Sequence, residues 1–210
     1  SVRDREIKFG LSVTGEVGLD HVWANNRGRA GQVLVLTKPL GTGLVAGARK
    51  RHAAGEVPEV VGGEDLAVAT QSMATLNRVA RNVAAEFPVT AATDVTGFGL
   101  LGHLGNIAAG SQLRARVFLA ALPALPGALG AASHGIIPGG SRANLEFMQK
   151  NGNLELEAGG PTQEREVDPR LWLAADAQTS GGLLLCIDAD ASKNLVAECT
   201  TISAPISNGF

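Results

Sequence analysis

Tyrosine is absent from the 210 residues, aromatic side chains make up only 4% of them, and no long apolar run occurs. A helix that crosses a membrane needs roughly 18 to 20 consecutive apolar residues, and no segment approaches that length. The opening stretch SVRDREIKFG also lacks the apolar core of a secretory signal peptide. We therefore expect neither a membrane-spanning helix nor a membrane partner.

An excess of charge of either sign is missing too. The 18 Lys and Arg residues nearly balance the 20 Asp and Glu residues, so the formal net charge is −2. Proteins that bind nucleic acids or anionic membranes usually carry a basic patch and a clear positive charge. We therefore expect no nucleic-acid partner.

Cysteine is scarce, since only Cys186 and Cys199 are present, and their spacing matches no metal-binding motif. Few cysteines without a disulfide framework are typical of a reduced, cytoplasmic protein, so we interpret both as structural thiols. The sequence also lacks a Walker A loop and a GxGxxG fingerprint. Their absence argues against the two phosphate-binding architectures that those motifs mark.

The composition that remains is that of a folded protein with many turns. Hydrophobic residues make up 45% and charged residues 18% of the chain, which is far from the composition of disordered segments. Glycine occurs 27 times, which indicates tight turns or close approaches of the backbone to a ligand. A length of 210 residues suits one large domain, or one domain with a piece of another.

We expect a domain boundary near residue 30. The chain does not begin with Met, and residues 7–17 form a strand-like run with no partner strand before it. The polar, turn-rich stretch WANNRGRAG (23–31) is typical of a linker. We therefore interpret residues 1–30 as the remnant of a preceding domain with its linker, and residues 31–210 as the main domain.

Strands alternate with helices along the main domain, which favours an α/β fold, here a two-layer α+β arrangement of helices on a sheet. An apolar stripe at steps of three and four predicts one helix over residues 64–87, ended by Pro88. Asp168 followed by Pro169 predicts the start of another helix. The remaining pattern predicts strands at 32–38, 114–121 and 181–189, and helices at 44–52, 142–150 and 189–199, the last with Asp190 as its N-cap.

Four stretches combine glycine with Thr or Ser at the ends of predicted elements. Backbone N–H groups at such a turn can hold an anion, and the hydroxyls add further donors. A glycine turn beside a helix is more often plain geometry, so each stretch alone is a weak indication of phosphate binding. The four are TKPLGTG (37–43), TDVTGFG (93–99), PGGSRAN (138–144) and QTSGG (178–182).

Asp94 is the most informative single residue, because it ends a short run of small, mostly apolar residues and precedes Gly97 and Gly99. Its carboxylate could cap the following turn. It could equally bind magnesium, which at nucleotide sites takes one or two carboxylates together with phosphate oxygens and water. The residues leave both interpretations open. We expect His103 to pack or bond on its own helix, and Asp176 to be a local hydrogen-bonding partner and not a ligand.

Taken together, four stretches carry a close resemblance to a known family. LTKPLGTG, ATDVTGFGLLGHL, PGGSRANLEF and AQTSGGLLL stand in this order and spacing in the selenophosphate synthetases (selenide, water dikinases). The resemblance covers essentially the whole chain. It implies the C-terminal domain of the fold shared with aminoimidazole ribonucleotide synthetase and thiamine-monophosphate kinase. The implied reaction converts ATP, selenide and water to selenophosphate, AMP and phosphate.

The resemblance also implies that much of the machinery lies outside these residues. Family members are longer at the N-terminus, where they carry the reactive Cys or selenocysteine, a catalytic Lys, a glycine-rich loop and most metal-binding aspartates. That ATP-binding domain builds a homodimer, and 1–30 would be its remnant, with Ser1 directly after a nucleotide-contacting Gly-Gly-His stretch. We therefore expect no catalytic residue in this chain, and no activity of the chain alone.

Residue by residue, the resemblance makes Asp94 a ligand of Mg²⁺ and sets Thr96, Gly97 and Gly99 along a phosphate-facing turn. Ala177 stands where the family usually has proline, and the tail TTISAPISNGF (200–210) matches the family poorly. Two alternatives remain, a superfamily enzyme for a purine precursor or thiamine phosphate, and a non-enzymatic interaction or regulatory paralogue. Further nucleotide- or phosphate-binding candidates, whose individual roles the resemblance does not assign, are Lys38, Thr42, Ser180, Gly181 and Gly182.

Overall fold

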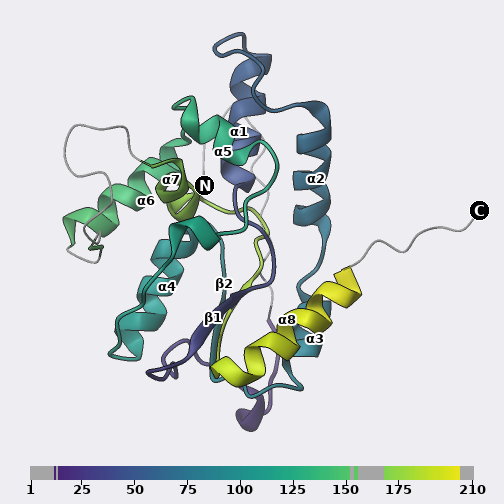
Figure 1. Ribbon diagram of the computed structural model, residues 1–210, viewed down its shortest axis with the longest axis vertical. Helices are drawn as coiled ribbons and strands as arrows, with labels where there is room; N and C mark the ends of the chain where they lie inside the picture. Colours follow the sequence, from purple (N-terminus) through teal and green to yellow (C-terminus); the bar gives the residue numbers. More distant parts are fainter. Residues whose placement is uncertain (1–11, 13, 152–153, 156–167, 204–210) are drawn as a thin grey trace, which may run out of the picture.

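The computed structural model describes residues 12, 14–151, 154–155 and 168–203, with side chains described to residue 198. Its strands and helices are arranged as Figure 1 shows. The strands are β1 (Val33–Leu36), β2 (Ala91–Asp94) and β3 (Leu183–Ile187). The helices are α1 (Thr42–Ala53), α2 (Gly63–Ala74), α3 (Arg78–Ala84), α4 (Gly99–Gly110), α5 (Ala128–Ser133), α6 (Gly139–Lys150), α7 (Pro169–Ala175) and α8 (Ala189–Ser203), with 3-10 turns η1 (Leu19–His21) and η2 (Leu119–Ala121).

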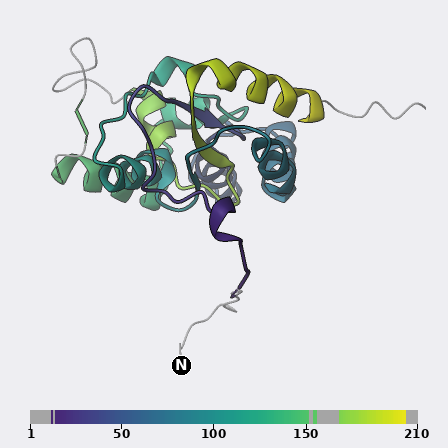
Figure 2. The ribbon, with the colours of Figure 1, turned by 90° about the horizontal axis from the view of Figure 1, so that it is seen from below.

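The three strands form one antiparallel sheet in the order β1-β3-β2, so β3 is central. Side chains of a strand alternate between the two faces of the sheet. Leu184 and Cys186 accordingly belong to the core under α1, α4 and α5, whereas Leu185 and Ile187 pack with α3 and α8. Figure 2 shows α8 running along one side of the sheet. Because both faces are covered, the central strand is a continuous apolar run, as the sequence predicted.

The single helix predicted over 64–87 is wrong, because the chain breaks at Thr75 into α2 and α3. Thr75 has extended backbone, and Leu76, which the apolar stripe included, is 70% exposed. Two long-range bonds accompany the break. The carbonyl of Thr75 accepts from Lys38 Nζ at 2.6 Å, and Asn77 Nδ2 donates to the carbonyl of Gly181 at 2.9 Å. The two halves of the apolar stripe pack against different helices, because α2 packs on α1 and α3 packs on α8.

The strand predicted over 114–121 is also wrong. Residues 113–118 have no regular structure, and η2 follows them. Beyond this segment, Leu40 N–H donates to Pro123 O and Leu125 N–H donates to Leu40 O. A hollow of about 860 Å³ lies between β1 and residues 113–118. The segment is therefore not a strand, because residues 113–118 take part in no β-ladder in the structure.

The segment interpreted as a linker is packed against the main domain. The guanidinium of Arg81 lies 5.9 Å from the ring centroid of Trp23, and Gly28 N–H donates to Ser111 Oγ at 2.9 Å. The strand predicted over 7–17 falls mostly outside the described residues, and its described positions, 12 and 14–17, have no regular structure.

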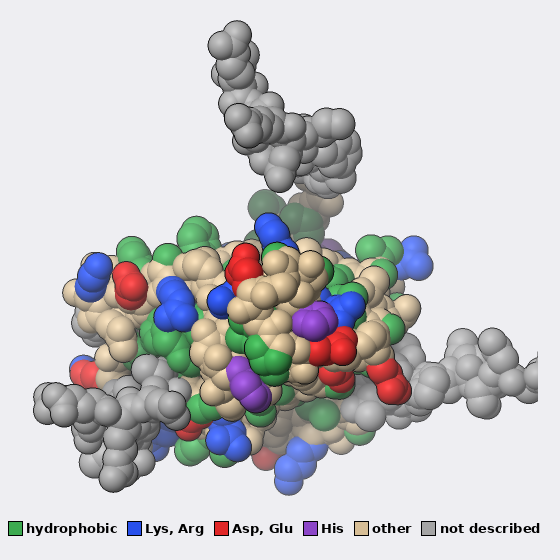
Figure 3. Space-filling view, turned by 90° about the horizontal axis from the view of Figure 1, so that it is seen from above, with side chains coloured by type: hydrophobic (Ala, Val, Ile, Leu, Met, Phe, Trp, Pro, Cys, Tyr) green, Lys and Arg blue, Asp and Glu red, His purple; other side chains and the backbone are tan. Residues whose placement is uncertain are grey.

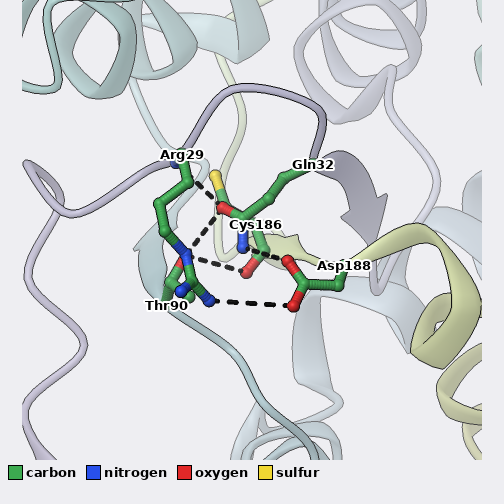
Figure 4. Close-up of polar contacts among 5 residues, drawn as sticks. All are labelled: Arg29, Gln32, Thr90, Cys186 and Asp188. Carbon is green, nitrogen blue, oxygen red and sulfur yellow. Dashed lines mark hydrogen bonds and ion pairs between the residues drawn. The ribbon is translucent and has the colours of Figure 1, made fainter.

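A polar cluster holds the end of this segment at the edge of the sheet (Figure 4). Gln32 donates from Nε2 to Asp188 at 2.8 Å and accepts from Arg29 N–H at 3.0 Å and Thr90 Oγ1 at 2.8 Å. The Arg29 guanidinium lies 3.7 Å from the Asp188 carboxylate, and Thr90 N–H donates to Cys186 O. Residues 29–32 are thereby tied to the ends of β2 and β3.

Two predictions concerned helix starts. Asp168 is the N-cap of α7, accepting from Arg170 N–H at 2.8 Å with Pro169 at the first helical position, so that prediction is confirmed. Asp190 is not a cap, because α8 begins at Ala189 and Asp190 lies in its first turn. A carboxylate there still interacts favourably with the helix dipole.

The described surface carries both charges in mixture. Figure 3 shows acidic and basic side chains interspersed over one face of the molecule, in keeping with a net charge of −2. Within the described ranges, no helix is both long enough and apolar enough to cross a membrane.

Candidate functional site

The four glycine-containing stretches converge around the buried side chain of Asp176. One carboxylate oxygen accepts from the N–H groups of Gly43 at 3.0 Å and Leu44 at 3.2 Å, in the first turn of α1. The other accepts from Ser141 Oγ at 2.7 Å, in the first turn of α6. The prediction that Asp176 is a local hydrogen-bonding partner is confirmed only for Gln178, two residues away, because its other partners, Gly43, Leu44 and Ser141, are distant in the sequence.

Gln178 extends this junction to two more turns. Its Nε2 donates to the Asp176 carboxylate at 3.0 Å, and its Oε1 accepts from the N–H groups of Gly41 at 3.1 Å and Thr42 at 3.3 Å. Its own N–H donates to Thr96 O at 2.9 Å. Gln178, which is 4% exposed, therefore binds the stretch 37–43 through its side chain and the stretch 93–99 through its backbone N–H.

Thr42, a candidate phosphate contact, lies inside this junction and is 2% exposed. Its hydroxyl accepts from Thr179 N–H at 2.8 Å and donates to Gln178 Oε1 at 3.2 Å. The hydroxyl is thus used to hold two protein turns together.

Lys38 points its ammonium group at backbone carbonyls. Nζ donates to Thr75 O at 2.6 Å and to Ser180 O at 2.8 Å, and burial lowers the pKa of Lys38. Ser180 has a φ of +50°, in the left-handed region that non-glycine residues seldom adopt. The Lys38 contact fixes the carbonyl of this strained residue.

The glycines of the candidate site differ in what they require. A Cβ on Gly181 would lie 2.1 Å from Val95 O, and one on Gly99, whose φ is +67°, would lie 2.7 Å from Ala175 O. Gly182 is similarly crowded by the backbone nitrogen of Lys38. Gly97 is exposed, with no heavy atom within 4 Å of its hypothetical Cβ. Only Gly97 therefore presents open backbone, and the other three permit close packing.

Asp94 ends β2 opposite Leu183 and is exposed. Within the described part of the chain, its carboxylate has neither a hydrogen bond nor an ion pair. The helix that follows, α4, has Phe98 at its N-cap and no side-chain cap. The capping interpretation of Asp94 is therefore wrong, and its carboxylate oxygens remain available to a cation.

His103 is bonded to the turn that precedes its helix. Its Nε2 lies 3.1 Å from both the N–H and the hydroxyl of Thr96, and its ring lies 5.8 Å from that of Phe98. Because a backbone N–H can only donate, Nε2 is the acceptor, and the neutral ring carries its hydrogen on Nδ1. Burial lowers the pKa of His103, and the charge of Asp94 opposes that shift. The Thr96 N–H is thus engaged by His103.

Other predicted chemistry is limited among the described residues. They contain no group of three or more His, Cys, Asp or Glu side chains placed to hold a metal ion. Cys186 is buried in β3, and burial raises the pKa of its thiol, which disfavours a reactive thiolate. Ser1 lies outside the described residues.

Sequence reasoning missed the side chains that join the four stretches. Asn144 Nδ2 donates to Gly97 O at 2.9 Å and to Ala175 O at 3.1 Å, and so links α6 to the turn beside Asp94. Ser141 and Gln178 act in the same way. Each lies within one of the four glycine-containing stretches. A polar side chain inside such a stretch was the sequence feature that could have indicated this role.

Comparison with known proteins identifies the family of the chain. Residues 29–202 match the family described as AIR synthase related protein, C-terminal domain. A selenide, water dikinase of Porphyromonas gingivalis is 41% identical over 191 residues, or 91% of this chain and 50% of that protein. The selenide, water dikinase of Pelobacter propionicus is 39% identical over 198 residues, 94% of this chain and 52% of that protein. The chain thus spans about half the length of the curated relatives it matches.

Two solved structures share the fold. Thiamine-monophosphate kinase from Stenotrophomonas maltophilia K279a superposes with a TM-score of 0.56 and 20% identity, covering 90% of this chain and 49% of that one. Hydrogenase maturation protein HypE in complex with ATP superposes with a TM-score of 0.52 and 20% identity, covering 88% of this chain and 42% of that one. At this identity the likeness concerns the fold alone.

Proposed function

The chain belongs to the family of AIR synthase related proteins, whose C-terminal domain it contains over residues 29–202, and on this premise we propose that it serves in the ATP-dependent synthesis of selenophosphate. The reaction consumes ATP, selenide and water and releases AMP and phosphate. The observation that carries the proposal is the 41% identity to a selenide, water dikinase over 91% of this chain. That match covers half of the relative. The proposal therefore concerns this chain together with a counterpart of the relative's other half, and this combination is called the full-length form below.

Asp94 would supply one ligand to magnesium. Its carboxylate is exposed, lies at a strand end beside the open backbone of Gly97, and has no partner among the described residues. Magnesium at phosphate sites takes one or two carboxylates and completes its shell with phosphate oxygens and water, so a single available carboxylate fits. When bound, the ion neutralises charge on the transferring phosphoryl group.

The remaining candidates divide by exposure. Gly97 and Ser180 are exposed and Thr96 is half-buried, and we assign the phosphate contacts to these three residues. Both the N–H and the hydroxyl of Thr96 lie 3.1 Å from His103 Nε2, so a phosphate contact from Thr96 would require its hydroxyl to turn from His103 to a phosphate oxygen. The buried candidates would support the turns that carry these contacts, and they are Thr42, Gly99, Gly181 and Gly182. Lys38 would support the same turns by holding the Ser180 carbonyl.

The full-length form would be a cytoplasmic homodimer, with ATP and selenide as substrates. The nucleophile, the catalytic Lys and the dimer contacts would lie in the other half, with Ser1 near the nucleotide.

The test is AMP formation by the full-length form under anaerobic conditions with ATP, magnesium and selenide. We expect AMP and a new ³¹P resonance of selenophosphate, both dependent on selenide. AMP or ADP formation driven instead by a purine precursor or thiamine phosphate would favour another superfamily enzyme. No nucleotide turnover with any of these would favour the non-enzymatic paralogue.

A further inference from the structure

Asp176 is a buried carboxylate that the proposed reaction does not use. Its side chain is 0% exposed, and it accepts from Gly43 N–H, Leu44 N–H, Ser141 Oγ and Gln178 Nε2. All four partners are neutral donors. An ionised carboxylate without a cationic partner is costly to bury unless hydrogen bonds satisfy it. Its acceptor-only chemistry matches the four donors that meet at this point.

These donors come from three separate pieces of the chain. Gly43 and Leu44 belong to the first turn of α1, and Ser141 to the first turn of α6. Helix N-termini carry unpaired N–H groups and a partial positive charge, so one carboxylate can hold two helix starts at once. Gln178 adds the turn 178–182. Its backbone N–H donates to Thr96 O, in the turn beside Asp94.

We propose that Asp176 is the positioning residue of the candidate site, because its carboxylate fixes the starts of α1 and α6 and the turn 178–182 relative to Asp94. The inference rests on the proposed function for its catalytic consequence, but not for its geometry. Asp176 acts through Gln178 and Ser141 and touches no substrate.

The arrangement of this junction should depend on whether the Asp176 carboxylate is protonated. Burial raises the pKa of Asp176 to about 6, against the hydrogen bonds from Ser141, Leu44, Gln178 and Gly43, which lower it. In the described part of the chain, no charged group is among those that set this pKa. When the carboxyl gains a proton, one oxygen becomes a donor and ceases to accept fully, so the junction rearranges.

The first arm of the test uses this chain and amide NMR over a pH range of about 5 to 8. We expect the Gly43 and Leu44 amide signals to titrate with a midpoint of about 6. Ser141→Ala keeps the carboxylate but removes a bond that lowers its pKa, so the midpoint should move upward. Asp176→Asn should abolish the titration and displace the signals of 93–99 and 178–182. Asp168→Asn, an N-cap change on α7, is the control and should leave both unchanged.

The second arm follows AMP formation by the full-length form. Asp176→Asn should lower kcat by roughly tenfold to a hundredfold, since small misplacements of reacting groups have effects of that size. The wild-type rate should fall on the acid side with the amide midpoint, and Ser141→Ala should move that limb and the amide midpoint together. A purely structural role would not couple the two.

The outcomes separate the two proposals. Unchanged signals at 93–99 and 178–182 in Asp176→Asn, or an unmoved midpoint in Ser141→Ala, would overturn the positioning role. So would an amide midpoint that moves while the rate profile stays fixed. If the wild type forms no AMP, the proposed function fails, and the displacement of those signals alone then supports or overturns the positioning role. If Asp176→Asn does not fold, Ser141→Ala decides.

Discussion

The ammonium group of Lys38 donates to the carbonyl oxygen of Ser180 at 2.8 Å, across 142 residues of sequence. The same nitrogen reaches Thr75 O at 2.6 Å. One cation therefore holds the turn 178–182 and the break between α2 and α3.

Replacing Lys38 with Met should destabilise the chain by about 1 to 3 kcal/mol, the usual size for hydrogen bonds from a charged donor, because the apolar stem is kept while both bonds are lost. Urea unfolding would measure the change. Lys193→Met, on the exposed side of α8, is the matched control and should stay within about 0.5 kcal/mol of wild type. Equal stability of the two variants would mean that the Lys38 bonds contribute nothing net.

Alanine at Gly181 should destabilise the chain, whereas alanine at Gly97 should leave its stability unchanged. In Gly181→Ala the new Cβ would meet Val95 O at 2.1 Å, and relieving such overpacking should cost about 3 kcal/mol. Gly97→Ala enters open space and should leave stability within about 0.5 kcal/mol. Thermal unfolding of both variants would check the contrast. In the full-length form, Gly97→Ala should still raise KM for ATP, because a methyl group would cover the open turn.

Asp176 should make stability depend on pH with an unusual sign. Its folded pKa of about 6 lies above the ordinary value of 3.8, so between these values the folded state binds more protons than the unfolded state. The contribution of Asp176 to stability is therefore largest below pH 4 and is lost as pH rises through about 6. A shift of about two units corresponds to roughly 3 kcal/mol.

The difference in unfolding free energy between wild type and Asp176→Asn isolates this effect from other acid-sensitive groups. Measured by urea unfolding at several pH values, the difference should change steadily between pH about 4 and 6 and level off above. A difference that is flat over this range would show that Asp176 does not titrate there.

Local signals in the sequence were enough for several elements. The cap and proline pair at Asp168 predicted the start of α7, and an uninterrupted apolar run predicted β3, because both depend on neighbouring residues. The break at Thr75 could not be predicted, since its carbonyl is held by Lys38, 37 residues away. Residues 113–118 have a strand-like sequence, but a strand forms only where a neighbouring strand is in position to hydrogen-bond with it, and the sequence of the segment does not show this.

The candidate site divides in the same way. An acid before a glycine turn indicated Asp94, which is exposed at the end of β2. The roles of Thr42 and Gln178 depend on the contact of two turns 137 residues apart, which no spacing along the chain encodes. Sequence motifs thus identified the stretches that meet at this junction, and the fold was needed to separate the exposed residues of these stretches from the buried residues that hold them together.

Asp94→Asn should leave the fold intact and lower turnover of the full-length form. The carboxylate has no hydrogen bond within the described residues, so unfolding should change by no more than about 0.5 kcal/mol. An amide oxygen is a weaker, uncharged magnesium ligand, and we expect at least about a hundredfold loss in AMP formation, partly restored by higher magnesium. Asp190→Asn, an exposed carboxylate on α8, is the control. Full activity of Asp94→Asn would remove it from the metal site.

The chain of 210 residues, tested alone with ATP, magnesium and selenide, should form no AMP above background. Phosphoryl transfer depends on positioned metal ions and phosphate clamps acting together, whereas within the described residues Asp94 is the single proposed metal ligand. The described thiol, Cys186, is buried with a raised pKa and is a poor nucleophile. The measurement compares AMP formed by the chain alone and by the full-length form at equal concentration. If the chain alone approaches the full-length rate, the reacting groups lie within these residues and the proposed division of the site between two halves is wrong.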